Sequence, residues 1–310
     1  MGIECKMDEL EFYLEDLKTK FLKINPNDYY LSYSGGKDSH FIYWFLKDWL
    51  KTNDFKMYED FLQIKIVGIN TYMEHKEILD RINKNCDIVL RPELKPFEIK
   101  EKYGSPCFSK WQDDMINRYQ NGCRRPYLIE RVTGIHKDTG EVVQGRFKLN
   151  KIAKEGVLND TLHKISPRCC EFLKKRPARK YEKESGRKAI LGVRGSESGL
   201  RKSQYTSCFT KDKKFTPLWD LPTSLLERIY NKYNIEIPYV YKYVSRTGCC
   251  ACPYGSYYGD TEKELEIITP QQRKFICRYF KESYDVLGID YQKYLDEEKK
   301  DWESEISKEK

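Results

Sequence analysis

The sequence has no apolar run that approaches the roughly 20 residues needed to cross a membrane. Its first residues also lack the apolar core of a secretory signal. Met7 stands where an N-myristoylation signal would carry Ser or Thr, which argues against that lipid anchor. Internal repeats are absent as well. We therefore expect a cytoplasmic protein with no membrane partner.

What the chain does have is charge and aromatic side chains. Charged residues make up 34% and aromatic residues 14% of the 310 positions, a composition typical of a packed protein with a highly charged surface. The formal net charge is +8, which permits a nucleic-acid partner without requiring one. Lysine and arginine crowd residues 164–202. This basic stretch either holds a polyanion or solvates a surface.

Six residues near the N-terminus form the central motif, Ser34-Gly35-Gly36-Lys37-Asp38-Ser39. An apolar run precedes the motif, and apolar residues at helical spacing follow it, so the order is strand, loop and helix. Glycines, a lysine and a helix N-terminus suit a phosphate group. The motif is not a Walker A loop, because GxxxxGK[ST] is absent. The alternative is an ordinary glycine-rich turn capped by Asp38 or Ser39.

Apolar strand patterns recur at residues 62–69, 86–90 and 188–193, with helical patterns between them. This alternation predicts an α/β fold with a mostly parallel sheet and helices on both faces. Right-handed crossovers place the carboxyl ends of such strands on one edge, where ligands bind. Arg194 and Arg201 follow the last of these strands. They either clamp a phosphate or pair with acids such as Glu197.

We divide the chain into three ranges. Residues 1–24 form an N-terminal helix, residues 25–215 the nucleotide-binding α/β domain, and residues 216–310 a C-terminal region of helices that also carries a Cys-x-x-Cys motif. An insertion near 121–155 is turn-rich, and a hairpin centred on residues 138–140 fits its pattern. Residues 296–310 read as a charged helix or frayed tail.

The sequence contains eleven cysteines, and in a long chain without a signal sequence these favour metal or redox chemistry over a disulfide scaffold. Cys169-Cys170 and Cys249-x-x-Cys252 form two pairs. Four thiolates suit tetrahedral zinc or a [4Fe-4S] cluster. The alternative is buried structural thiols. Cys250 lies inside the second pair and could replace a neighbour as ligand.

These motifs together resemble those of one known family. The 34–39 motif is similar to the PP-loop SGGKDS of the adenine-nucleotide alpha-hydrolase-like superfamily, whose fold is HUP-like. The vicinal cysteines, the Gly-Val-Arg-x-x-Glu-Ser-x-x-Arg block at 192–201 and the Gly-Cys-x-x-Cys-Pro element resemble the phosphoadenosine phosphosulfate reductase family.

The resemblance implies that adenine nucleotide is held by the following residues: Ser34, Gly35, Gly36, Lys37, Asp38, Ser39, Thr71, Glu74, Gly192 and Arg194. It also implies a [4Fe-4S] cluster on Cys169, Cys170, Cys249 and Cys252. Glu74 and His75 could instead be an exposed helix start, and we favour this for His75.

Within the family, the chain is closest in type to the iron-sulfur protein of DNA phosphorothioation. That resemblance implies an ATP pyrophosphatase that binds ATP with Mg²⁺, adenylates a substrate and lets a sulfur nucleophile displace AMP. Lys37, Asp38, Arg194 and Arg201 would be the catalytic residues. The implied partners are a nucleic-acid acceptor, DNA or tRNA, and a sulfur donor such as a cysteine desulfurase.

Two other functions compete with this one. Adenylyl sulfate or phosphoadenylyl sulfate reductases of the family supply a nucleophile from a C-terminal Glu-Cys-Gly-Leu-His segment, whereas this sequence ends Ser304-Glu305-Ile306-Ser307-Lys308-Glu309-Lys310. The intact 34–39 motif also favours ATP over a sulfated nucleotide. The third possibility is a non-catalytic regulator that binds nucleotide or nucleic acid and keeps the cluster as a sensor or brace.

Overall fold

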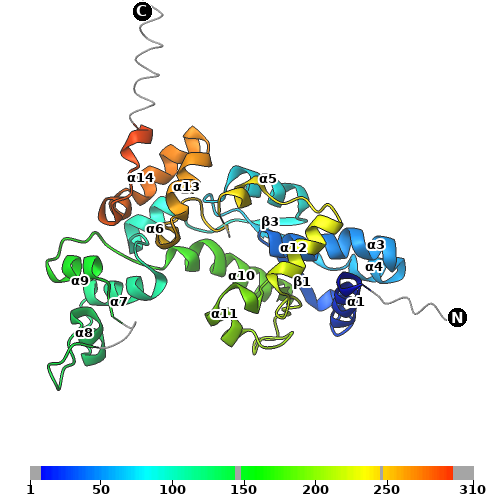
Figure 1. Cartoon of the computed structure of the whole chain (residues 1–310), viewed down its shortest axis with the longest axis horizontal. Coiled ribbons are helices and arrows are strands. Elements are labelled where there is room, and N and C mark those ends of the chain that lie inside the picture. Colours follow the sequence, from blue (N-terminus) through cyan, green and yellow to red (C-terminus); the bar gives the residue numbers. More distant parts are fainter. Residues whose placement is uncertain (1–7, 144–147, 245–246, 296–310) are drawn as a thin grey trace, which may run out of the picture. The chain divides into compact units, whose positions relative to one another are not determined.

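The computed structural model describes residues 8–143, 148–244 and 247–295 (Figure 1). The chain divides into two compact units. Unit 1 consists of Met1–Asn70, Lys76–Arg91 and Pro177–Tyr241, and unit 2 of Thr71–His75, Pro92–Arg176 and Lys242–Lys310. Each unit is built from three separate segments, whereas the ranges expected from the sequence are continuous. We describe the units one at a time.

Unit 1 is organised around a four-stranded sheet. The strands are β1 (Tyr29–Tyr33), β2 (Lys65–Ile69), β3 (Ile88–Leu90) and β4 (Lys188–Ile190). Their order is β3-β2-β1-β4, and every neighbouring pair is parallel, with Leu31 of β1 opposite Ile66 of β2 and Ile190 of β4. The parallel α/β sheet expected from the sequence is confirmed.

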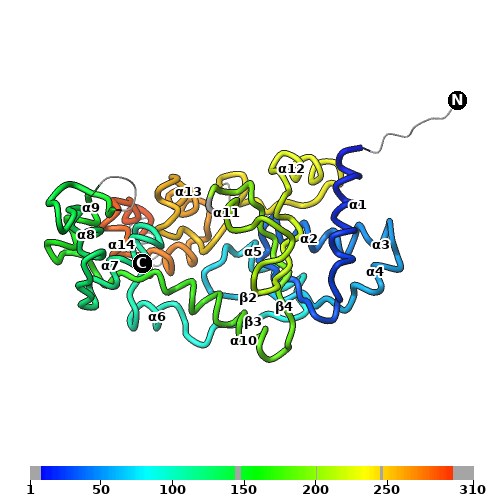
Figure 2. Tube along the Cα trace, turned by 90° about the horizontal axis from the view of Figure 1, so that it is seen from below, coloured from blue at the N-terminus to red at the C-terminus, as the bar shows by residue number. Residues whose placement is uncertain are grey.

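Helices cover both faces of this sheet. The chain steps outward from β1 to β2 and β3 and then returns to the other side of β1, so right-handed crossovers put α5 (Lys76–Asn85) and α10 (Arg176–Ser185) on opposite faces. Figure 2 shows these two helices on opposite sides of the strands. Tyr30 of β1 packs edge-to-face on Tyr181 of α10, with ring centroids 4.9 Å apart.

The other helices of unit 1 include α2, which begins directly after the central motif. Their bounds are α1 (Glu9–Phe21), α2 (Lys37–Trp44), α3 (Leu50–Asn53), α4 (Phe55–Phe61), α11 (Gly199–Gln204) and α12 (Thr223–Lys232), and a π-helical turn over Phe45–Trp49 links α2 to α3. The amphipathic pattern of the N-terminal segment forms α1 as predicted, because Leu10, Leu14 and Leu17 are buried along one face.

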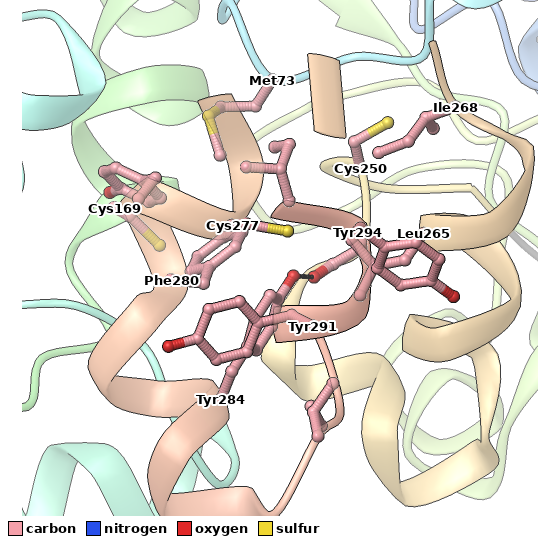
Figure 3. Packing of buried hydrophobic residues seen from close by; sticks show 14 of the residues in the cluster. Met73, Cys169, Cys250, Leu265, Ile268, Cys277, Phe280, Tyr284, Tyr291 and Tyr294 are labelled. Carbon is pink, nitrogen blue, oxygen red and sulfur yellow. Dashed lines mark hydrogen bonds between the residues drawn. The ribbon is translucent and has the colours of Figure 1, made fainter. Parts of the chain in front are cut away.

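Unit 2 is helical and has two hydrophobic cores among its described residues. Its helices are α6 (Pro96–Tyr103), α7 (Lys110–Gln120), α8 (Pro126–Thr133), α9 (Lys151–Leu158), α13 (Asp260–Ile267) and α14 (Pro270–Leu287). One core gathers Leu265, Ile276, Phe280 and Tyr284 with several cysteines (Figure 3). The other joins α7, α8 and α9, which lie side by side in both views (Figures 1 and 2).

The insertion is more helical than its sequence suggested. A turn does form near residues 138–140, but the only antiparallel pairing described there is the single bridge between Ile135 and Val142. Helices α8 and α9 flank it, because Leu128 with Val132 and Ala153 with Val157 recur four residues apart and bury together. A short hairpin thus forms where the sequence predicted its centre, with His136 N bonded to the Glu141 carbonyl and Val143 N to the Gly134 carbonyl, and the flanking parts of the insertion are helical. Residues 144–147 and the predicted C-terminal helix or tail, 296–310, lie outside the described residues.

No helix in the described part of the chain combines the length and the apolar character that a membrane span requires.

Candidate functional site

The phosphate-type loop connects β1 to α2 in unit 1. Gly35 has φ +73°, a backbone conformation that favours glycine. A Cβ there would also lie 3.0 Å from both Cγ2 and the carbonyl oxygen of Ile78, so there is no room for a side chain. Gly36 is the N-cap of α2 and no side chain caps the helix. The first amides of α2 are therefore not capped by a side chain of the loop.

Ser34 and Ser39 brace the loop from within. Ser39 Oγ accepts a hydrogen bond from Ser34 N at 3.1 Å and donates to the carbonyl of Gly36 at 3.1 Å. The two hydroxyls lie 3.1 Å apart. Ser39 is 4% exposed, so its hydroxyl shapes the loop from inside.

The loop lies at the point where the sheet changes direction. β1 and β4 are neighbours; from β1 the chain continues to β2 on one side, and after β4 it pairs on the other side through the parallel bridge between Ile190 and Phe215. In open parallel sheets ligands bind at the carboxyl ends of such strands. Gly192, just after β4, packs against the start of α2: a Cβ there would lie 2.8 Å from Asp38 C and Ser39 N. Two motifs far apart in the sequence thus meet at one place.

Arg194 is committed to Asp38. Its side chain is buried, and Nε donates to Asp38 Oδ1 at 2.6 Å, while one terminal nitrogen donates to Thr223 Oγ1 at 2.8 Å and Ser196 Oγ at 3.2 Å. This guanidinium therefore fixes the orientation of the Asp38 carboxylate. The structure shows the ion pair, and the phosphate role of Arg194 stays a prediction.

Arg201 pairs with Glu197 within the same block and is more exposed than Arg194. The pKa of Glu197 is raised, mainly by burial and also by the neighbouring Asp38 carboxylate. Two acids and two arginines thus lie near the start of α2, with the neighbouring acids Glu197 and Asp38 paired to Arg201 and Arg194.

Lys37 has two tyrosine neighbours that the sequence did not indicate. Its N–H donates to the hydroxyl of Tyr241 at 3.1 Å, and its ammonium lies 5.3 Å from the centroid of the same ring. Tyr230 Oη donates to the Lys37 carbonyl at 2.5 Å. Both tyrosines lie about two hundred positions further along the chain, in aromatic segments with no motif of their own. Only the tertiary fold identifies them.

Thr71 and Glu74 belong to unit 2, whereas the loop belongs to unit 1. The Glu74 carboxylate accepts hydrogen bonds from Thr71 N at 2.9 Å and Thr71 Oγ1 at 2.5 Å. His75 is 5% exposed, with Nε2 3.2 Å from Glu264 Oε1, and Glu74 is 8% exposed. The alternative of an exposed helix start is wrong, because both side chains have buried polar partners.

All four candidate cluster ligands belong to unit 2. The Cys169 thiol hydrogen-bonds to Cys170, which lowers the pKa of Cys170 to about 5 and raises that of Cys169. Burial raises the pKa of Cys249 and Cys252. The four sulfurs are close enough for Cys249 and Cys252 to act electrostatically on Cys169. The two pairs seen in the sequence therefore converge.

A lysine accompanies the thiols. The pKa of Lys174 is raised, chiefly by Cys249 and then by Glu74 and Cys170. Lys174 lies in a π-helical turn, Glu171–Lys175, that begins directly after the vicinal cysteines. Its ammonium offsets negative charge on the thiolates.

Cys250, the remaining cysteine of the 249–252 segment, lies in a different environment from the four candidate ligands. It is 1% exposed within the hydrophobic core, beside Ile268 and on the opposite side of the drawn cluster from Cys169 (Figure 3). The Cys250 amide donates to the Met73 carbonyl at 2.6 Å. Tyr284 Oη donates to the carbonyl of Ala251 at 2.5 Å, and Ala251 adopts φ +43°. These contacts fix the loop and point Cys250 into the core.

The donor set can be tested against the two metal centres that the sequence left open. Among the described residues, no three His, Cys, Asp or Glu side chains are placed to share one metal ion. A tetrahedral zinc ion would hold its sulfurs about 3.8 Å apart, given Zn–S bonds of about 2.3 Å. A [4Fe-4S] cluster is a larger body with thiolate ligands around it. Four thiols beside one ammonium are a donor set that either centre would use, and the [4Fe-4S] assignment stays a prediction.

Comparisons with known proteins give a structural resemblance but no match in sequence. No protein-family model and no curated protein matches the sequence. Among solved structures, the chain is similar to phosphoadenylyl-sulfate (PAPS) reductase from Candida auris, in its phosphate complex, with 12% sequence identity and a TM-score of 0.38. The match covers 78% of this chain and 96% of that one.

Proposed function

We propose that unit 1 binds the phosphate groups of an adenine nucleotide at the 34–39 loop. The observation that carries the proposal is the meeting of this loop with the 192–201 block at the switch point of a parallel sheet. The N-terminus of α2, which no side chain of the loop caps, and the Lys37 ammonium would attract phosphate oxygens.

The reaction we propose is adenylation of a substrate by ATP, with release of pyrophosphate, as preparation for sulfur transfer. Lys37 and the loop amides would stabilise the charge that develops on the leaving pyrophosphate. Asp38, oriented by Arg194, would hold the Mg²⁺ that accompanies ATP. Glu197 and Arg201 are the other charged side chains near the start of α2. The acceptor we favour is DNA or tRNA, and the sulfur donor a protein such as a cysteine desulfurase.

We further propose that Cys169, Cys170, Cys249 and Cys252 hold a [4Fe-4S] cluster. Such a cluster would supply a redox-active centre with polarisable sulfur. Lys174 would balance its negative charge, and Glu264 would keep the second pair in place by accepting the Ala251 amide hydrogen.

A sulfonucleotide reductase is the second candidate, because the cysteine pairs and the 192–201 block resemble that branch of the family as well. That reaction needs a thiolate to attack the sulfate sulfur and release AMP or its 3′-phosphorylated form. The last cysteine of this sequence is Cys277, which lies in α14 and is fully buried. Its burial makes Cys277 unsuitable as the nucleophile of that reaction.

One anaerobic experiment separates the candidates. The iron-reconstituted protein is incubated with radiolabelled ATP, adenylyl sulfate or its 3′-phosphorylated form, with DNA or tRNA and a cysteine desulfurase present. AMP and pyrophosphate from ATP would support our proposal. Sulfite from a sulfated nucleotide without ATP turnover would establish the reductase instead. Tight nucleotide binding with no turnover of either would favour the regulator.

A further inference from the structure

Residues 236–241, which we call the strap, contact the start of α2 through Tyr241. Tyr241 accepts the Lys37 N–H and places its ring beneath the Lys37 ammonium. These are the two groups of Lys37 that the proposed function assigns to a phosphate. A protein side chain therefore occupies the place where a ligand oxygen would sit.

The strap is fastened to α5 at two further points. The Glu77 carboxylate accepts the Tyr239 amide at 2.6 Å and the Val240 amide at 3.4 Å. Arg81 donates to the Glu236 carbonyl at 3.0 Å. These hydrogen bonds hold the backbone of the strap close to the loop. The position of Tyr241 beside Lys37 therefore depends on the whole segment and not only on the rotamer of one side chain.

The arrangement in which Tyr241 contacts Lys37 leaves one buried hydrogen-bond donor unpaired. Arg81 is 8% exposed, yet its second terminal nitrogen has no hydrogen-bond partner among the residues that the structure describes. An unpaired buried donor is costly. The strap is thus held by several hydrogen bonds, but this position leaves one buried Arg81 donor unpaired, which reduces its net stability.

We propose that Tyr241 is a displaceable occupant of the phosphate loop, which inorganic pyrophosphate or the triphosphate of a nucleotide expels. The inference rests on the proposed function of the loop. A phenol hydroxyl offers a neutral acceptor to the Lys37 amide, whereas a phosphate oxygen offers a charged one, and charge-assisted hydrogen bonds are roughly twice as strong. The anion therefore displaces Tyr241 from Lys37. Its apparent affinity is nevertheless lower than its intrinsic affinity, because Tyr241 occupies the site in a fraction of the molecules.

The position of Tyr241 in the chain gives this exchange a second effect. Tyr241 is the last residue of unit 1 on this segment, and the chain enters unit 2 at Lys242. Release of Tyr241 would loosen the segment at which the chain passes from the nucleotide loop's unit to the cysteines' unit.

The test is pyrophosphate binding to the full-length protein, measured by calorimetry under anaerobic conditions. Tyr241→Phe keeps the ring and removes the acceptor, so we expect about five-fold tighter binding, the equivalent of one neutral hydrogen bond. Tyr239→Phe is the matched control, since its ring is on the same strap and its backbone amide is the group that binds Glu77. The affinity of this control should be unchanged.

Limited trypsin digestion provides a second readout, because Lys242 is exposed and directly follows Tyr241. Pyrophosphate should accelerate cleavage after Lys242 in the wild type and have less effect in Tyr241→Phe, where the strap is already weakened. Unchanged or weaker pyrophosphate binding by Tyr241→Phe, with Lys37→Ala still abolishing binding, would overturn the strap proposal and leave the loop's function intact. Absence of pyrophosphate binding by the folded wild type would overturn both.

Discussion

Lys37 concentrates the charge of the loop in one side chain. Replacing it with alanine removes the ammonium but leaves the N–H and the glycine geometry in place. We expect Lys37→Ala to lower the rate of pyrophosphate release from ATP by about 10²- to 10³-fold, as loss of one preorganised electrostatic contact does elsewhere. Lys51→Ala, at an exposed position of α3, is the control and should match the wild type. Equal rates for both variants would remove Lys37 from the mechanism.

The two arginines of the 192–201 block differ in what they contribute to stability. Arg194 is buried against Asp38, so Arg194→Ala leaves an unpaired carboxylate and should cost about 3–5 kcal/mol in the free energy of unfolding. Arg201 pairs with Glu197 at a more exposed position, and Arg201→Ala should cost less than about 1 kcal/mol. Urea titration measures both. A larger loss at Arg201 would contradict this ranking.

His40 makes unit 1 sensitive to acid. Burial, helped by Arg81, lowers its pKa to about 3, and its Nδ1 lies 2.9 Å from the Tyr33 hydroxyl. The folded state thus favours neutral histidine, so this contribution to stability is complete above pH 6.5 and declines as the pH falls toward 3. We expect a loss of about 2 kcal/mol at pH 5 from this residue. Urea titrations at pH 7.5 and pH 5 should show a smaller difference for His40→Asn.

Cys250 and Cys252 have different surroundings and should respond differently to mutation. Cys250 packs in the core, so Cys250→Ala should keep its iron and its visible absorbance. Cys252→Ala removes one proposed ligand and should lose both. Iron and sulfide analysis after anaerobic purification measures the outcome. A colourless wild type with stoichiometric zinc would refute the cluster.

At the scale of elements, the contact between the end of β4 and the start of α2 holds the site together. A Cβ on Gly192 would lie 2.8 Å from backbone atoms of residues 38 and 39, which cannot yield as a side chain would. Gly192→Ala should destabilise the protein by about 1–3 kcal/mol and weaken pyrophosphate binding. Gly199→Ala has open space around its Cβ and should be neutral. Thermal unfolding and calorimetry would show whether the two glycines differ.

Elements whose burial follows a simple period could be predicted from the sequence. The four strands of the sheet and the helices after them follow such patterns, and the structure has them in the expected places. α8 and α9 escaped prediction because the turn residues between them dominated the pattern of the insertion. Their few apolar positions become informative only when the two helices pack together.

At the scale of the whole molecule, the part of the site that is contiguous in the sequence could be predicted, whereas contacts between distant segments could not. The 34–39 loop is contiguous in sequence, so its residue types alone predicted a phosphate site. The pairing of Arg194 with Asp38, and of Tyr241 with Lys37, depends on which segments the fold brings together. The buried environment of His75 likewise comes from Glu264, far along the chain.

The interleaving of the two units has a consequence for how the protein is made. Tyr29 of β1 pairs with Lys188 of β4, so the centre of the sheet cannot be completed until most of unit 2's middle segment has been synthesised. Closing so long a loop is slow. Until the ribosome has synthesised β4, one edge of β1 (Tyr-Tyr-Leu-Ser-Tyr) has no partner strand. An unpaired strand edge readily pairs with other chains. We expect the nascent protein to need chaperone protection over this interval, before the 192–201 block can pack against its nucleotide loop.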